Sequence, residues 1–130
     1  MKTLKHSFRL YVLPNELDNT VRFYEELQQS KCERRLSFPD TGIEVAVVGN
    51  FIILAGTTDV LAPHKHVLVT LAVDSLDEAY SWLKKNGATM LSEPHNTPVG
   101  KNLFVRNPDG LVVEYFEPAR AATGSAADSD

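Results

Sequence analysis

The sequence predicts a single α+β domain made of two related halves, each of which runs strand, helix and then further strands. Three observations predict this class. Short alternations of apolar and polar residues, typical of half-buried strands, recur along the chain. Two stretches with apolar residues at helical spacing lie among them. The same order of elements then returns about 60 residues later, as it does in an internal repeat.

The length, charge and cysteine content of the chain indicate what kind of protein it is. It has 130 residues, of which 43% are hydrophobic and 23% are charged, as expected for one globular domain with one core. The net charge is −4, so the chain offers no excess of basic residues to attract nucleic acid or an anionic membrane. We therefore expect neither as a partner. Cys32 is the only cysteine, and the N-terminal residues carry no apolar leader segment. These features predict a cytoplasmic protein without disulfides.

The first half is predicted to span residues 6–56. Residues 8–12 alternate apolar and polar side chains and are predicted to form a strand. Residues 17–29 carry an apolar stripe at helical spacing. The other predicted strands of this half are residues 32–38, 43–48 and 51–55. The last two form a hairpin around Gly49 and Asn50, which tolerate the positive φ of a tight turn.

The second half, at residues 66–118, repeats this order after a connector at residues 57–65. Ser75 and Glu78 match a capping box at the start of a second amphipathic helix. The predicted strands are residues 67–73, 88–91, 102–106 and 111–116, with a polar loop at 93–100. Residues 119–130 are rich in Ala, Ser, Gly and Asp, and we expect them to form a disordered tail.

Three sequence motifs resemble the vicinal oxygen chelate superfamily, which includes glyoxalases, bleomycin resistance proteins and extradiol dioxygenases. The strongest is FVRNPDGLVVE at residues 104–114. The others are YV at 11–12 followed by FYE at 23–25, and VDSLDEA at 73–79. The resemblance covers residues 8–118. It implies two βαβββ modules whose mixed sheets curl around a cavity, and it is much less specific for function than for fold.

Members of this superfamily commonly hold a divalent metal in the cavity. The resemblance places its ligands early in the first strand of each half and late in the last strands. Those positions hold Ser7, Leu68, Leu54 and Glu114, and only Glu114 is a good ligand. We therefore expect no cofactor. The alternative is one divalent metal ion at a displaced site that includes His66 and Glu114.

The alternation of side chains along the strands predicts the cavity lining. The expected ligand-binding residues are Ser7, Arg9, Tyr11, Leu68, Thr70, Phe104, Arg106 and Glu114. Aromatic and apolar groups with a few polar ones are the usual composition of a small-molecule site. Structural roles remain open beside this one. Arg9 and Glu114 would neutralise each other as a buried pair, Tyr11 and Phe104 would belong to the core, and Arg106 would lie on the surface.

Two side chains outside the strands are further candidates. His95 lies in the Pro-rich loop, where it is either solvated or an acid–base group. Trp82 lies off the apolar stripe of the second helix, so it is either partly buried packing or a contact at a rim or a dimer interface.

The sequence favours a metal-independent small-molecule binding protein over an enzyme. Members of the superfamily that lack metal ligands include antibiotic-sequestering proteins, so the resemblance implies a homodimer that binds an antibiotic or another aromatic drug. The alternative is a glyoxalase-like lyase, isomerase or thiol transferase in which Glu114 is a general base or a metal ligand. A third possibility is a regulatory module whose cavity is vestigial.

Overall fold

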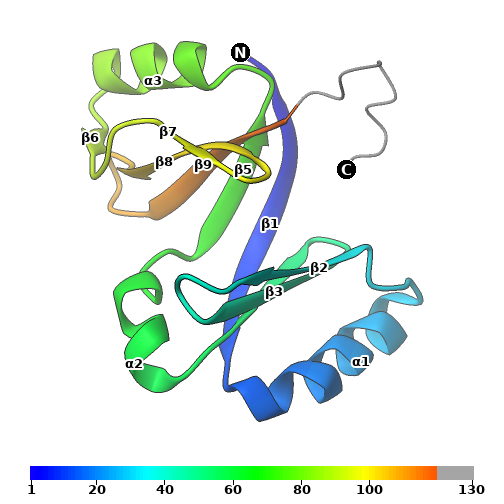
Figure 1. The fold of residues 1–130 in the computed structure, drawn as a ribbon. Helices are drawn as coiled ribbons and strands as arrows, with labels where there is room; N and C mark the ends of the chain where they lie inside the picture. Colours follow the sequence, from blue (N-terminus) through cyan, green and yellow to red (C-terminus); the bar gives the residue numbers. More distant parts are fainter. Residues whose placement is uncertain (120–130) are drawn as a thin grey trace. The chain divides into compact units, whose positions relative to one another are not determined.

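The structure, a computed structural model, describes residues 1–119, and it divides the chain into two compact units (Figure 1). The first unit is Ser7–Leu68. The second unit is Met1–His6 together with the chain from Val69 onward. The predicted tail lies outside the described residues, apart from Ala119, whose backbone N–H donates to the carbonyl of Val99 at 3.0 Å.

In the first unit, one long helix packs on a four-stranded mixed sheet. Its elements before the connector are β1 (Thr3–Val12), a 3₁₀ turn at Pro14–Glu16, α1 (Leu17–Gln28), β2 (Arg34–Phe38), β3 (Ile43–Val48) and β4 (Phe51–Ala55). The strand order is β2-β3-β4-β1, and only the β1–β4 pair is parallel. Strand β1 is longer than the predicted strand at residues 8–12, since it begins at Thr3. Its residues 3–6 belong to the second unit.

Helix α1 covers one face of this sheet. Its buried residues Leu17 and Val21 pack against Val48 and Ile53, as the helical spacing predicts. The helix ends where Gln29 adopts a left-handed conformation with φ of 53°, and the Gln29 N–H is shared between two carbonyls of the last turn. The predicted hairpin between β3 and β4 is confirmed.

The connector contains structure that the sequence did not predict. Helix α2 (Thr58–Leu61) is followed by a 3₁₀ turn at Ala62–His64. The side chain of Thr57 caps α2 by accepting the N–H of Val60 at 3.4 Å. A single turn of helix is too short to produce an apolar period, which is why residues 57–65 were predicted only as a connector.

The second unit repeats the arrangement of the first. Its elements are β5 (Val69–Val73), α3 (Leu76–Lys85), β6 (Thr89–Met90), β7 (His95–Thr97), β8 (Gly100–Arg106) and β9 (Val112–Pro118). The strand order is β5-β9-β8-β6, with β7 paired to β8. Only the β5–β9 pair is parallel. The prediction of an α+β fold with two βαβββ-like modules and mixed sheets is confirmed.

Two details of the second unit differ from the prediction. Strand β7 forms where a polar loop was expected, because His95, Asn96 and Thr97 pair with β8 in register. The capping box at α3 is only half made. The hydroxyl of Ser75 accepts the N–H of Glu78 at 3.2 Å, but the Glu78 carboxylate forms an ion pair with the terminal amine of Met1.

The core of the second unit lies between the sheet and α3. Its buried residues are Val73, Leu76, Ala79, Leu83, Leu103, Val105, Val113 and Tyr115. Val69 and Leu71 pack against this cluster, so the predicted alternation of faces along β5 is confirmed. Thr70, Phe104 and Glu114 are cross-strand partners on the opposite face. Within residues 1–119, no helix is long and apolar enough to span a bilayer.

Tyr115 makes the stability of the second unit sensitive to alkaline pH. Burial raises the pKa of its hydroxyl above the usual 10.0, although the hydroxyl also hydrogen-bonds to Asn107. The unfolded chain therefore ionises first, so this contribution is complete below about pH 10 and is lost as the pH rises further. Urea unfolding at pH 9 and pH 11 should show a larger loss of stability in the natural protein than in Tyr115→Phe. Equal losses would contradict the prediction.

Candidate functional site

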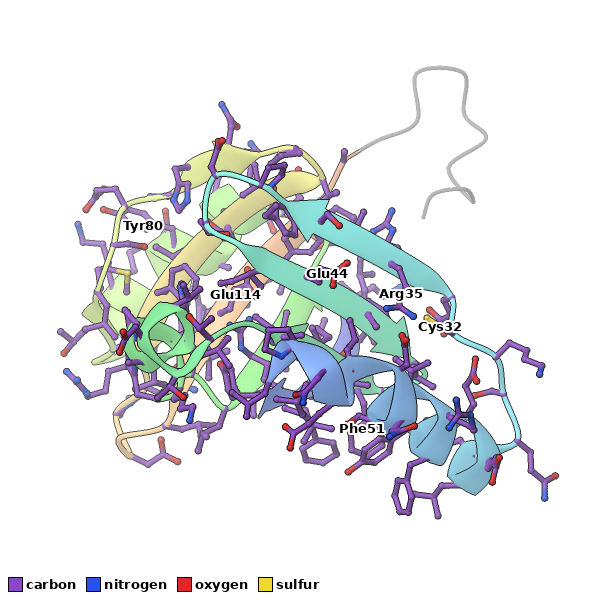
Figure 2. All side chains as sticks on the ribbon, turned by 60° about the horizontal axis from the view of Figure 1, so that its bottom comes forward. Cys32, Arg35, Glu44, Phe51, Tyr80 and Glu114 are labelled. Carbon is purple, nitrogen blue, oxygen red and sulfur yellow. The ribbon has the colours of Figure 1, made fainter. Side chains whose placement is uncertain are left out.

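A polar cluster lies on the face of the second sheet that α3 does not cover. Glu114 stands on β9 between Thr70 on β5 and Phe104 on β8. Its Oε1 accepts a hydrogen bond from the Thr70 hydroxyl at 2.9 Å, and its Oε2 accepts one from the Asn102 amide at 3.1 Å. Two donors on neighbouring strands thus orient the Glu114 carboxylate, which is labelled in Figure 2.

Asn102 belongs to this cluster but is not among the predicted ligand-binding residues. Its side chain is only 9% exposed, and within residues 1–119 its Oδ1 atom has no hydrogen-bond partner. The orientation of the amide follows from Glu114, because its N–H group donates to the Glu114 carboxylate and Oδ1 therefore points the other way. A buried acceptor without a partner costs about 1–3 kcal/mol, so such groups in native proteins call for an explanation. The sequence could have indicated Asn102 as a site residue, because it lies two positions before Phe104 and therefore on the same face of the strand.

Two aromatic residues share this sheet face with the carboxylate. Phe104 is the cross-strand partner of Glu114, and Phe116 is the partner of both Asn102 and Ala72. Both rings are half-buried. Phe116 is a second residue absent from the predicted site. Arg106, which was predicted for it, stands exposed at the end of β8 opposite Val112.

Two predicted residues of the first unit, Arg9 and Tyr11, are hydrogen-bonded to each other. The Arg9 Nε atom donates to the Tyr11 hydroxyl at 2.9 Å, and the Arg9 guanidinium lies 5.6 Å from the centre of the Tyr11 ring. The Tyr11 oxygen lies 2.7 Å from the carbonyl oxygen of His64 and 2.6 Å from that of Val67. One hydroxyl proton serves both carbonyls, so Tyr11 holds the connector against β1 and orients Arg9.

The remaining predicted positions of the first unit are apolar or buried. Ser7 is buried, and Leu54 packs in a cluster with Ile43 and Leu61. The Leu68 side chain is 53% exposed, while its carbonyl accepts the N–H of Arg9 at 3.1 Å. The structure thus gathers Thr70, Phe104 and Glu114 on one sheet face in the second unit, and Arg9 with Tyr11 in the first.

The predicted metal-ligand positions hold few donor atoms for a divalent ion. Nowhere in residues 1–119 do three His, Cys, Asp or Glu side chains gather closely enough to hold an ion. Protein metal sites normally need three or four such ligands. His66, from the displaced alternative, is an exposed residue of the first unit.

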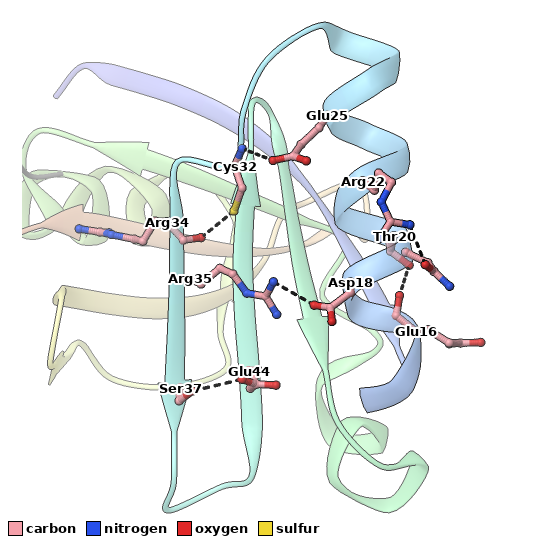
Figure 3. Close-up of polar contacts among 11 residues, drawn as sticks. Glu16, Asp18, Thr20, Arg22, Glu25, Cys32, Arg34, Arg35, Ser37 and Glu44 are labelled. Carbon is pink, nitrogen blue, oxygen red and sulfur yellow. Dashed lines mark hydrogen bonds and ion pairs between the residues drawn. The ribbon is translucent and has the colours of Figure 1, made fainter.

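Cys32 has structural partners rather than catalytic ones (Figure 3). Its backbone N–H donates to the Glu25 carboxylate at 2.8 Å, and its thiol donates to the carbonyl of Arg34 at 3.4 Å. Arg35 of β2 forms an ion pair with Asp18 of α1, with 3.0 Å between Nη1 and Oδ1. These contacts tie the segment after α1 to both β2 and the helix.

Comparison with known proteins agrees with this geometry. The family model described as Glyoxalase/Bleomycin resistance protein/Dioxygenase superfamily matches residues 6–115. A solved structure of an uncharacterised protein from Methanosarcina mazei is 37% identical, covers 93% of this chain and 97% of its own, and has a TM-score of 0.85. No curated protein matches.

More distant structures share the fold. Methylmalonyl-CoA epimerase from Mycobacterium tuberculosis is 16% identical over 90% of this chain and 89% of its own, with a TM-score of 0.66. The epimerase from Streptomyces coelicolor, in complex with 2-nitronate-propionyl-CoA, is 15% identical over 91% and 99%, with a TM-score of 0.64. At these identities the likeness concerns the fold alone.

Proposed function

Because this chain belongs to the Glyoxalase/Bleomycin resistance protein/Dioxygenase superfamily, we propose that it is a metal-independent small-molecule binding protein. One observation carries the proposal. A fixed carboxylate, that of Glu114, lies on a sheet face of the second unit that also carries two half-buried phenyl rings, those of Phe104 and Phe116. A few oriented polar groups within an aromatic surface are the usual make-up of a small-molecule site.

The chemistry of this cluster defines the ligand class. An ionised carboxylate only accepts hydrogen bonds, and two of its acceptor positions are already used by Thr70 and Asn102. A carboxylate therefore favours a ligand with N–H or O–H donors or a positive charge. Phe104 and Phe116 favour an aromatic ligand, since rings stack or meet edge to face. A cationic aromatic compound, such as a basic antibiotic, combines both features.

Metal independence is supported by the donor set. Ser7, Leu54 and Leu68 replace three of the ligands that the fold commonly supplies, and two of them carry no donor atom in the side chain. The remaining ligand, Glu114, is held by side-chain donors. We therefore propose that the ligand binds without a metal ion.

An enzyme that uses Glu114 as a general base is the second candidate. The carboxylate is partly exposed, so it can meet a substrate proton directly. Lyase, isomerase or thiol-transferase chemistry would convert the bound compound, whereas a binding protein returns it unchanged. Mass spectrometry of a ligand recovered after prolonged incubation separates the two.

Glu114→Gln is expected to weaken ligand binding by about tenfold or more, because a hydrogen bond to a charged group contributes about 1.5–3 kcal/mol. The measurement is a thermal-shift screen of aromatic amines, amidines and basic antibiotics, followed by titration of each compound that stabilises the natural protein. Such a compound at 100 times its Kd adds about 2.7 kcal/mol.

Glu44→Gln is the matched control. Glu44 is an exposed strand carboxylate that also accepts a hydrogen bond from a hydroxyl, that of Ser37 at 3.3 Å. It should bind the same compounds as the natural protein. Compounds that stabilise Glu114→Gln as much as the natural protein would contradict the proposal.

Two further measurements test the rest of the proposal. Elemental analysis of protein purified without a His-tag should find no stoichiometric metal, and one bound ion per chain would favour the metal-dependent alternative. Analytical ultracentrifugation tests the homodimer that the superfamily resemblance implies.

A further inference from the structure

Trp82 is the only tryptophan of the chain, and it is not needed for the core. Helix α3 buries Leu76, Ala79 and Leu83, which recur at helical spacing on one side. Trp82 lies beside that stripe, and 55% of its surface is exposed. A large exposed aromatic side chain on a short helix invites a binding role, because exposing its apolar surface to water is unfavourable.

A hollow of about 310 Å³ lies next to Trp82, on the α3 side of the second sheet. It is lined by Trp82, Leu83, Asn86, Ala88, Asn107, Pro108, Asp109 and Tyr115. Tyr115 and Glu114 are adjacent on β9, so their side chains point to opposite faces. The hollow is therefore distinct from the Glu114 cluster and is no part of the function proposed above.

The walls of the hollow are held in place by hydrogen bonds. In the β8–β9 turn, the N–H of Asn107 donates to the Leu111 carbonyl at 2.8 Å, and the N–H of Gly110 donates to the Asn107 carbonyl at 2.8 Å. The Tyr115 hydroxyl donates to Asn107 Oδ1 at 2.9 Å. On the helix side, the Asn86 amide donates to the Trp82 carbonyl at 2.7 Å. A preformed site of this kind loses little entropy when a ligand binds.

Asp109 gives the hollow a negative charge. It is the only charged residue among the lining residues, and its Oδ1 accepts the N–H of Leu111 at 3.2 Å. Burial is the main cause of the raised pKa of Tyr115, and the negative charge of Asp109 raises that pKa further. On its other side Trp82 borders a second hollow, of about 420 Å³, whose lining includes Asp77 and Glu78 as well as Lys85.

We propose that the hollow beside Trp82 binds a small organic cation of the alkylammonium type. The indole ring is the best aromatic partner for such a cation, and Asp109 supplies the opposite charge. Leu83, Ala88 and Pro108 offer apolar contacts to the alkyl groups around the nitrogen. An inorganic divalent ion would need several oxygen ligands, and an anionic ligand would need a cationic partner that the lining lacks.

The single tryptophan makes the test direct. Choline chloride replaces sodium chloride at constant ionic strength, and the emission of Trp82 is followed with excitation that tyrosine does not absorb. The neutral isostere 3,3-dimethylbutan-1-ol is titrated in parallel. We expect choline to change the emission saturably, and the neutral compound to bind several-fold more weakly. Saturation-transfer NMR from the protein to the choline methyl groups is the second readout.

Two variants localise the site. Asp109→Asn keeps an Oδ1 acceptor for the Leu111 N–H but removes the charge, and it should weaken choline binding about threefold. Asp40→Asn removes the same charge from another exposed residue that follows a proline, in the first unit, and should bind choline like the natural protein. Equal affinity for the two probes, an unchanged Kd in Asp109→Asn, or no choline signal by either readout would overturn the proposal.

Discussion

Replacing Leu103 by alanine is expected to lower the free energy of unfolding by about 3–4 kcal/mol, within the range for buried leucines. Leu103 lies on β8 with 0% of its surface exposed, inside the core between α3 and the second sheet. The loss combines the transfer free energy of the deleted methyl groups with the cavity left behind, which the surrounding strands fill only partly.

Urea unfolding gives the measurement. The midpoint should fall while the slope with denaturant stays constant, which identifies a change in stability rather than in the compactness of the unfolded chain. Leu68→Ala is the matched control, because the same atoms are deleted from a side chain that is 53% exposed. It should change stability by about 0.5 kcal/mol or less. Comparable losses in both variants would contradict the prediction.

Gly100→Ala is expected to be about as destabilising, at roughly 3 kcal/mol, but for a different reason. Gly100 begins β8 with φ of +155°, a conformation that residues with a side chain rarely adopt. A Cβ atom there would collide with the backbone carbonyl oxygen of Glu117 and would lie 3.0 Å from two atoms of the Phe116 ring. The backbone cannot yield without breaking the β8–β9 pairing.

Gly110→Ala separates strain from collision. Gly110 also has a positive φ, of +98°, but nothing lies within 4 Å of the added atom. It should therefore cost only about 1–2 kcal/mol. Because Phe116 lies on the same face of β9 as Glu114, Gly100→Ala should also weaken ligand binding, whereas Gly110→Ala should leave it unchanged. A Gly100→Ala protein as stable as Gly110→Ala would contradict the collision.

The order of elements was predictable because periodicity reports burial directly. Leu76, Ala79 and Leu83 recur at helical spacing and are all buried, and the alternation along β5 correctly separates Val69 and Leu71 from Thr70. Hydrogen bonds made by short polar segments produce no periodic pattern in the sequence. Strand β7 consists of His95, Asn96 and Thr97, whose composition indicates a loop and whose pairing depends on β8.

The candidate site was predictable only in part. The resemblance pointed to Glu114, and the alternation of strand residues added Thr70 and Phe104, which do lie beside it. Asn102 was missed because its role depends on a specific hydrogen bond to the carboxylate and on its burial, neither of which a strand pattern encodes. The partners of Tyr11 were equally invisible, since they are backbone carbonyls of the connector.

Strand β1 has a consequence for synthesis of the protein. Its first residues dock in the second unit, where the N–H of Lys2 donates to Asp74 at 2.7 Å and its carbonyl accepts the N–H of Asp74 at 3.0 Å. On the ribosome, residues 1–6 therefore emerge before the whole first module but find their partners only after it has been made. Such long-range pairing slows folding. Until β5 has been made, the first residues of β1 are an unpaired strand edge, open to wrong partners and to chaperones.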